Sequence, residues 1–171
     1  MRTAGQLAVL SMAGAVATCG GNAPQRLTED SVSQVLGAVA SDLHQRYDAQ
    51  RIVVSRQVFC GYPEPCGEGP ESVWRSPQLH AAIDAFGWEL VERNADATHP
   101  QSGADVALRF GNVGLVGSDT AQVFVRSEHQ GEPFWEMNVH RFTLVRRDSD
   151  WVVASHAVIT SAHRADTLLP R

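Results

Sequence analysis

The sequence predicts an α+β fold: two helices packed on a curved antiparallel sheet of about four to five strands that ends in a β-meander. Two stretches carry apolar residues at steps of three and four, which is the spacing of an amphipathic helix. The last third of the chain is instead rich in β-branched and aromatic residues, in segments separated by turn signals. Helices followed by a run of strands favour helices covering one face of an antiparallel sheet.

The first helix is expected to begin just after Thr28. Thr28 can act as the N-cap, and Glu29 and Asp30 place negative charge in the first turn, where the helix dipole favours it. One apolar stripe follows over about five turns. Its members are Val32, Val35, Leu36, Val39, Leu43 and Tyr47.

A strand is expected over Arg51–Phe59, and a second helix over residues 77–92. Ser76-Pro77 is an N-cap followed by proline at the first helical position. In that helix Trp88 would lie on the side away from the apolar stripe. Trp88 and Tyr62 are therefore a candidate interaction surface, with the alternative that the loop around Tyr62 covers Trp88.

The remaining strands are expected to form a meander, with turns at the sequences GNVG, HQGE and RDSD. Both faces of the last hairpin are about equally apolar, so we expect the sheet to be covered on both sides. A homodimer through the sheet is one way to cover it. The predicted strands are Asp105–Phe110, Thr120–Glu128, Pro133–Arg147 and Trp151–Ala162.

The N-terminus has the pattern of a secretory signal. Arg2 carries a positive charge, and an uncharged, mostly small and apolar run extends from Leu7 to Ala17. A membrane-spanning helix needs roughly 20 predominantly apolar residues, and this run is about half that length. We therefore expect export without a permanent membrane span.

Two cleavage sites compete at the end of this leader. Cleavage after Ala17 would use a small-x-small site. The stretch Val16-Ala17-Thr18-Cys19 instead resembles the lipobox of bacterial lipoproteins. That resemblance implies a lipid such as palmitate on Cys19 and, with Gly20 next, an anchor in the outer membrane facing the periplasm.

The lipoprotein interpretation divides the chain into four parts. They are a lipoprotein signal peptide at 1–18, a flexible tether at 19–27, a single α+β domain at 28–163 and a C-terminal tail at 164–171. About 150 residues remain after the leader, which is the size of one domain.

Cys60 and Cys66 lie close together in a loop rich in proline and glycine. In an oxidising exported compartment such a pair is typical of a disulfide. Cys19 is then left without a thiol partner, which favours its lipidation. A zinc site is disfavoured because five residues separate the pair and no second Cys or His pair follows. We expect no metal.

Composition excludes several function classes. The net charge is −5, and all 14 basic residues are arginines without a basic run, so nucleic acid is not an expected partner. No glycine-rich phosphate loop leads from a strand into a helix, so no nucleotide cofactor is expected. The expected partners are the membrane, through the lipid, and an envelope protein or small-molecule ligand.

The order of elements and the closing strands resemble the NTF2-like and cystatin-like group of folds. The phrase from Asp148 to Val153, a turn before a strand that begins with Trp, is similar to the last hairpin of that group. The resemblance implies a bent sheet around a helix, and a function that ranges from isomerases and dehydratases to binding modules. We expect a non-catalytic binding or interaction domain at the cell envelope.

The alternative is an enzyme that uses an acid or base on the longest predicted strand. Glu136, Asn138 and His140 share one face of that strand by alternation. Pairing Arg146 with Trp151 across the last turn would place His140 opposite Ala157. His156 would then lie on the other face, so a joint site of the two histidines would require a one-residue slip. His140 with Glu136 is therefore the candidate acid–base pair.

Overall fold

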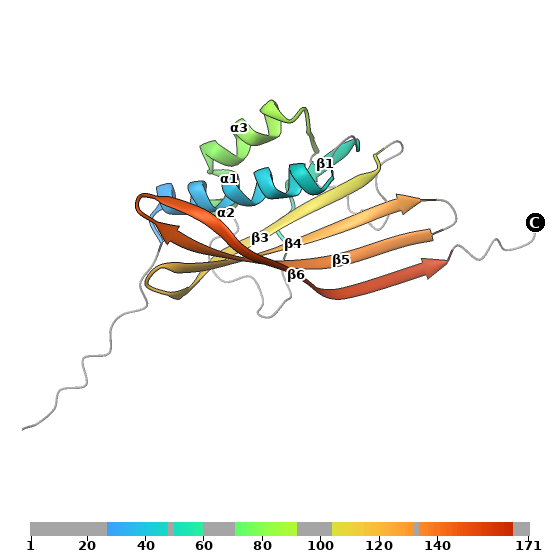
Figure 1. Cartoon of the computed structure of the whole chain (residues 1–171). Helices are drawn as coiled ribbons and strands as arrows, with labels where there is room; N and C mark the ends of the chain where they lie inside the picture. The colour runs from blue at the N-terminus through green and yellow to red at the C-terminus, as the bar shows by residue number, and fades with distance from the viewer. Residues whose placement is uncertain (1–26, 48–49, 60–70, 92–103, 132–133, 166–171) are drawn as a thin grey trace, which may run out of the picture.

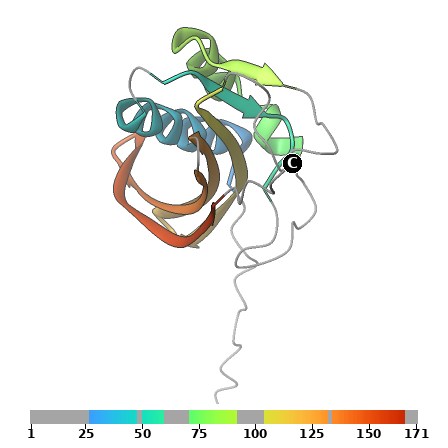
Figure 2. The same ribbon diagram turned by 90° about the vertical axis from the view of Figure 1, so that its right-hand side faces the viewer.

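The computed structural model describes residues 27–47, 50–59, 71–91, 104–131 and 134–165. It confirms the predicted α+β class: helices lie on one face of a curved, open sheet (Figure 1). Seen along the strands, α1 lies in the concavity of the sheet (Figure 2). The elements are α1 (Glu29–Arg46), β1 (Ile52–Ser55), α2 (Glu71–Trp74), α3 (Pro77–Ala85), β2 (Glu89–Val91), β3 (Val106–Gly117), β4 (Thr120–Gly131), β5 (Phe134–Arg147) and β6 (Asp150–Ala165).

The sheet has six strands in the order β2-β1-β3-β4-β5-β6. The predicted meander is confirmed, because β3 to β6 pair antiparallel with their neighbours in sequence. The antiparallel sheet of about four to five strands that the sequence predicts is extended at one edge by parallel pairing. There β1 pairs in parallel with both β2 and β3, because the chain returns to the same end of the sheet before each of these strands begins.

Helix α1 begins and ends where the sequence predicts. The Thr28 hydroxyl accepts a hydrogen bond from the Ser31 amide at 3.2 Å, and the Tyr47 amide donates to the Leu43 carbonyl at 3.0 Å. Its buried face packs into the concavity of the sheet. The fully buried residues of that face are Val35, Leu36, Val39, Ala40 and Leu43.

The second predicted helix is shorter than expected. α3 begins after the predicted N-cap Ser76 but ends at Ala85, because Gly87 adopts φ +66°, a left-handed conformation that stops the helix. The chain then enters β2 instead of continuing helical to residue 92. Glycine favours this conformation because it has no Cβ.

Trp88 follows that turn and is only 7 % exposed. Its ring centroid lies 5.4 Å from that of Phe86 and 6.3 Å from that of His44 on α1. The prediction that Trp88 contributes to an exposed interaction surface is therefore wrong. Its proposed companion Tyr62 lies outside the described residues.

The predicted turn at GNVG is also wrong, because β3 continues through it to Gly117. A register shift between Phe110 and Val113 lets the strand bend and remain paired with β4. The turn falls at Ser118 and Asp119 instead. Strand β6 likewise runs to Ala165, two residues past the predicted end of the domain.

Some predictions concern segments that the structure does not describe. The leader with Cys19, and the pair Cys60 and Cys66, lie outside the described residues, so the lipid anchor and the disulfide stay predictions. Among the helices that are described, none has the length and apolar character needed to cross a membrane.

Candidate functional site

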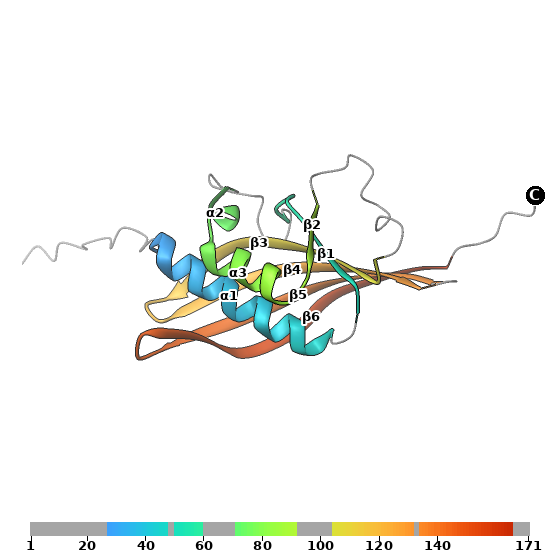
Figure 3. The ribbon, with the colours of Figure 1, turned by 90° about the horizontal axis from the view of Figure 1, so that it is seen from above.

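The concave face of the sheet changes from apolar to polar past the C-terminal end of α1. Beneath the helix this face is built from apolar side chains such as Val125, Phe142 and Leu144. Strands β4, β5 and β6 continue beyond the end of α1 (Figures 1 and 3). The polar side chains in and beyond this region, here named the polar face, are Ser127, His129, Glu136, Asn138, His140, His156 and Ser161.

The predicted shared face of Glu136, Asn138 and His140 is confirmed. β4 and β5 pair without a register shift, and His129 lies opposite Glu136 while Ser127 lies opposite Asn138. Alternation therefore places the three β5 residues on the side of the sheet that carries Phe142, which is packed in the core.

The predicted register of the last hairpin holds only at its turn. Arg146 pairs with Trp151 as expected, but a shift between Thr143 and Leu144 leaves Ala154 without a partner on β5. This β-bulge moves the following residues of β6 by one position as far as Val158, and a second shift at Ile159 moves the residues after it by one position more. His140 therefore lies opposite Val158 rather than Ala157, and the prediction that His156 lies on the other face is wrong.

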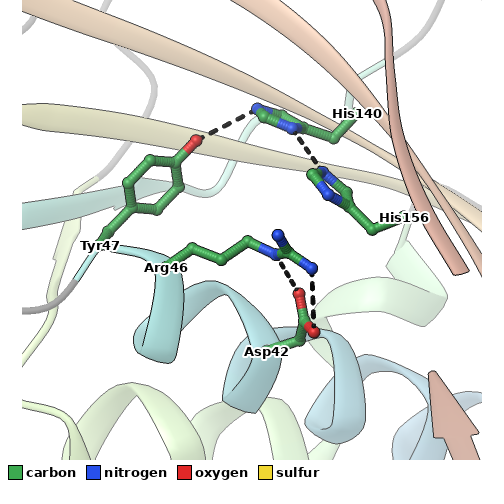
Figure 4. Close-up of polar contacts among 5 residues, drawn as sticks. All are labelled: Asp42, Arg46, Tyr47, His140 and His156. Carbon is green, nitrogen blue, oxygen red and sulfur yellow. Dashed lines mark hydrogen bonds and ion pairs between the residues drawn. The ribbon is translucent and has the colours of Figure 1, made fainter.

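The bulge brings His140 and His156 into direct contact (Figure 4). His140 Nδ1 lies 2.8 Å from His156 Nε2, and the two rings stack at a centroid distance of 5.1 Å. On its other side, His140 Nε2 lies 2.7 Å from Ser127 Oγ and 3.2 Å from Tyr47 Oη. Both nitrogens of this buried imidazole therefore have partners.

Helix α1 and strand β4 supply the rest of this network. Tyr47, at the C-cap of α1, donates from its hydroxyl to Ser127 Oγ at 3.3 Å. His129 Nε2 lies 3.3 Å from the same oxygen. In the sequence, Tyr47 belongs to the apolar stripe of the first helix, and no motif marks Ser127 or His129. The spacing of Ser127 and His129, two residues apart on one strand, was the available signal.

Burial keeps these histidines neutral. Burial, with smaller contributions from the neighbouring His156 and His129, lowers the pKa of His140 from 6.5 to about 4. Burial also lowers the pKa of His129 and that of His156. The pKa of the Tyr47 phenol is raised, again mainly by burial. The network at neutral pH is therefore a set of uncharged donors and acceptors.

Glu136 belongs to a second, adjoining chain of hydrogen bonds. The Ser161 hydroxyl donates to Asn138 Oδ1 at 2.6 Å, and Asn138 Nδ2 donates to Glu136 Oε1 at 2.7 Å. Glu136 makes no hydrogen bond to His140, so the predicted acid–base pair is not in direct contact. Its negative charge still raises the pKa of His140, against the larger effect of burial.

An ion pair on α1 borders the network. Arg46 donates from Nε and Nη2 to the carboxylate of Asp42, one turn earlier on the helix (Figure 4). The positive charge of Arg46 lowers the pKa of His156, while the negative charge of Asp42 raises it. The guanidinium thus adds to the forces that keep His156 neutral.

Ser127, His140 and His156 have the spacing of a nucleophile, a base and a group that orients the base. Ser127 is 0 % exposed, however, with Tyr47 and His129 both at its hydroxyl, so a substrate cannot reach it in this structure. Ser127 therefore acts as a structural link. Nor do three His, Cys, Asp or Glu side chains meet to hold a metal ion within the described ranges.

A separate charged cluster lies on the opposite face of the sheet. Glu128 is 2 % exposed, and its Oε1 lies 2.9 Å from Arg126 Nη2 and 3.7 Å from Arg109 Nη2. The two guanidinium groups offset the cost of burying this carboxylate. We assign this cluster to the stability of the sheet.

The chain matches no protein-family model, no curated protein and no solved structure. The resemblances to a lipoprotein leader and to NTF2-like folds therefore stay predictions from the sequence. The chemistry of the polar face rests on the geometry of its own side chains.

Proposed function

We propose that this protein is an exported, lipid-anchored domain of the cell envelope that binds a small polar ligand on its polar face without transforming it. The observation that carries the proposal is the gathering of polar side chains on the concave face where α1 ends. An apolar lining would suffice if this part of the sheet served only to complete the core.

The polar face has the layered construction expected of a binding site. Its inner members, Ser127, Asn138 and His140, are buried and hydrogen-bonded to one another or to their neighbours. They hold the partly exposed members, such as Glu136 and His156, in one orientation. Pre-organised polar groups of this kind lower the entropy lost when a ligand binds.

The cellular location is proposed from the leader. Arg2, the apolar run after it and the lipobox-like stretch ending at Cys19 support export and lipidation. The membrane partner is then a lipid bilayer reached through the anchor, with an outer-membrane position facing the periplasm.

The binding proposal is tested by screening uncharged and charged envelope metabolites against the mature chain, with amide chemical shifts as the readout. A genuine ligand should shift the amide resonances of residues on the polar face. The double variant Glu136→Gln/His156→Gln should weaken the affinity for that ligand at least tenfold. Arg141→Gln is the matched control, because Arg141 is exposed on the opposite face of β5. The proposal would be contradicted if ligands bound the double variant with the same affinity and the same chemical-shift changes as the wild type.

The anchor is tested by the intact mass of the protein recovered from a bacterial membrane fraction, with and without alkylation after reduction. The expected mass corresponds to a chain that begins at a lipidated Cys19. Two alkylatable thiols, from Cys60 and Cys66, should appear only after reduction. A mass that begins at Thr18, or at Met1 with three free thiols, would overturn the lipoprotein assignment.

The second candidate function is an enzyme that uses His140 as an acid or base with Glu136 nearby. One observation favours it: the contact with His156, which fixes the orientation of the His140 imidazole as a catalytic base requires. The two functions differ in what is recovered from a complex. From a binding domain, the ligand is recovered chemically unchanged. An enzyme would convert the ligand to a product, and the His140→Gln variant would lose this turnover.

A homodimer through the sheet is a further proposal about partners. The apolar residues on both faces of the last hairpin support it. Light scattering on the purified mature chain should then give twice the chain mass, and a monomeric mass would contradict it.

A further inference from the structure

Four side chains form one continuous hydrogen-bonded chain across three strands. His156 contacts His140 at 2.8 Å, His140 contacts Ser127 at 2.7 Å, and Ser127 contacts His129 at 3.3 Å. The two middle members, His140 and Ser127, are buried, whereas the two end members are partly exposed. A buried link therefore connects two accessible imidazoles on the polar face.

A neutral imidazole carries a single proton, on one of its two ring nitrogens. The chain can therefore be satisfied in two opposite directions. In the first, His129 donates to Ser127, Ser127 to His140 Nε2, and His140 Nδ1 to His156 Nε2. In the second, His156 Nε2 donates to His140 Nδ1, His140 Nε2 donates to Ser127, and Ser127 donates to His129 Nε2. Each direction satisfies every link without adding a charge.

Tyr47 is compatible with both directions. Its hydroxyl donates to Ser127 Oγ, which has two lone pairs and one proton. The serine can therefore accept from Tyr47 and donate its own proton to either His140 or His129. The chain can thus reverse without breaking the contact with α1.

The direction of the chain decides what its ends offer to a ligand. In the first direction His156 carries its proton on Nδ1 and is a donor there. In the second, the same nitrogen is an acceptor, and His129 Nδ1 becomes the donor. Neither Nδ1 has a hydrogen-bond partner among the described residues, and neither is a buried unpaired atom. Both nitrogens are therefore open to a bound molecule.

The charges around the chain do not favour a protonated imidazole. Arg46 and Asp42 of α1 compensate each other, and Glu136 of β5 is engaged by Asn138 rather than by a histidine. Tyr47 of α1 contributes an uncharged phenol. No carboxylate forms an ion pair with His129, His140 or His156 in the parts of the chain that the structure describes. Around His156, therefore, the site offers no uncompensated charge that could pair with an ionic ligand.

We propose that His156 is the ligand-contact group of the polar face, that the chain reverses to make it a donor or an acceptor, and that the site takes uncharged hydroxyl- or amide-bearing ligands in preference to ions. The inference rests on the proposed binding function and names the chemistry of its ligand. Ser127 and His140 are positioning residues in this scheme, because they act through His156.

Reversal is tested first without any ligand, by ¹⁵N–¹H correlation spectra of the histidine rings in the labelled mature chain. The wild type should show His156 exchanging between both tautomers. In His129→Leu, Ser127 can donate only to His140, so His156 should shift to the tautomer protonated on Nδ1. His163→Leu is the matched control, because His163 lies on the same face of β6 outside the chain. An unchanged His156 tautomer in His129→Leu would overturn the reversal.

Ligand chemistry is tested next with acetamide, acetate and ethylammonium, three probes of similar size, at equal concentration. Acetamide should shift the His156 ring signals most, and His156→Gln should abolish the saturable shifts of the polar face. Equal or larger shifts with either ion would overturn the preference for uncharged ligands. If no probe shifts any residue of the polar face, the binding site itself fails, whatever the tautomer experiment shows about reversal.

Discussion

His140 Nδ1 and His156 Nε2 lie 2.8 Å apart because strand β6 carries one extra residue, Ala154, between their pairing positions and the hairpin turn. Without that bulge, strict alternation would place the two imidazoles on opposite faces of the sheet. A single unpaired backbone position therefore creates the centre of the polar face. β-bulges redirect side chains in this way where a strand bends.

The contact between His140 and His156 should appear as an energetic coupling. In a double-mutant cycle of His140→Gln and His156→Gln, we expect the double variant to lose about 1 kcal/mol less unfolding free energy than the sum of the two single losses. Urea denaturation of the four proteins measures this difference. A matched cycle of His140→Gln with Thr160→Ala, an exposed β6 residue, should be additive. Additivity in the first cycle would mean that the contact contributes nothing to stability.

Stability should fall on acidification because of His140. Its pKa is about 4 in the folded chain, against 6.5 for an ordinary histidine. The His140 imidazole therefore binds a proton below pH 6.5 in the unfolded chain, but only below about pH 4 in the folded chain. The stabilisation is complete above pH 6.5 and is lost as the pH falls towards 4.

The size of that loss follows from the same two values. A pKa near 4 instead of 6.5 corresponds to about 3 kcal/mol of unfolding free energy. Urea denaturation between pH 7.5 and pH 4 should therefore give a shallower pH dependence for His140→Gln than for the wild type. Identical slopes would show that His140 does not titrate differently in the folded and unfolded chains.

Ser76→Ala should cost more than an ordinary helix cap. The Ser76 hydroxyl accepts from the Leu79 amide at 3.1 Å and donates to Ser33 of α1 at 3.1 Å, and both serines are buried. We expect a loss of about 2–3 kcal/mol, since a cap and a buried partner are removed together. Thr28→Ala removes an exposed cap and should cost about 1 kcal/mol. Equal losses in thermal or urea unfolding would contradict this.

Gly111 should tolerate no side chain, whereas Gly114 on the same strand should. A Cβ on Gly111 would lie 2.8 Å from the Phe124 carbonyl oxygen and 3.3 Å from that of Phe59, so backbone on both sides would have to move. Gly111→Ala should therefore lose about 1–3 kcal/mol of unfolding free energy. A Cβ on Gly114 meets nothing within 4 Å, so Gly114→Ala should change stability by less than about 1 kcal/mol. Similar unfolding midpoints for the two variants would be the contrary result.

Local patterns were enough to predict several elements. Thr28 and the apolar stripe predicted α1 because capping and amphipathic spacing act within a few turns of one helix. The turn at Asp148 and Ser149 and the shared face of Glu136, Asn138 and His140 were predicted for the same reason. Both depend on turn chemistry and strand alternation, which neighbouring residues determine.

Other features depend on the tertiary structure alone, and they occur where the chain departs from a regular strand or helix. The bulge at Ala154 depends on how the long edge strand bends around α1, and no residue near it signals an interruption. Trp88 is buried because the turn at Gly87 directs the chain into β2, next to a histidine of α1 that is distant in sequence. The sequence by itself determined helix α1, the start of α3 and the order of the strands in the meander. Packing between distant segments decided the register, and through it which histidines meet.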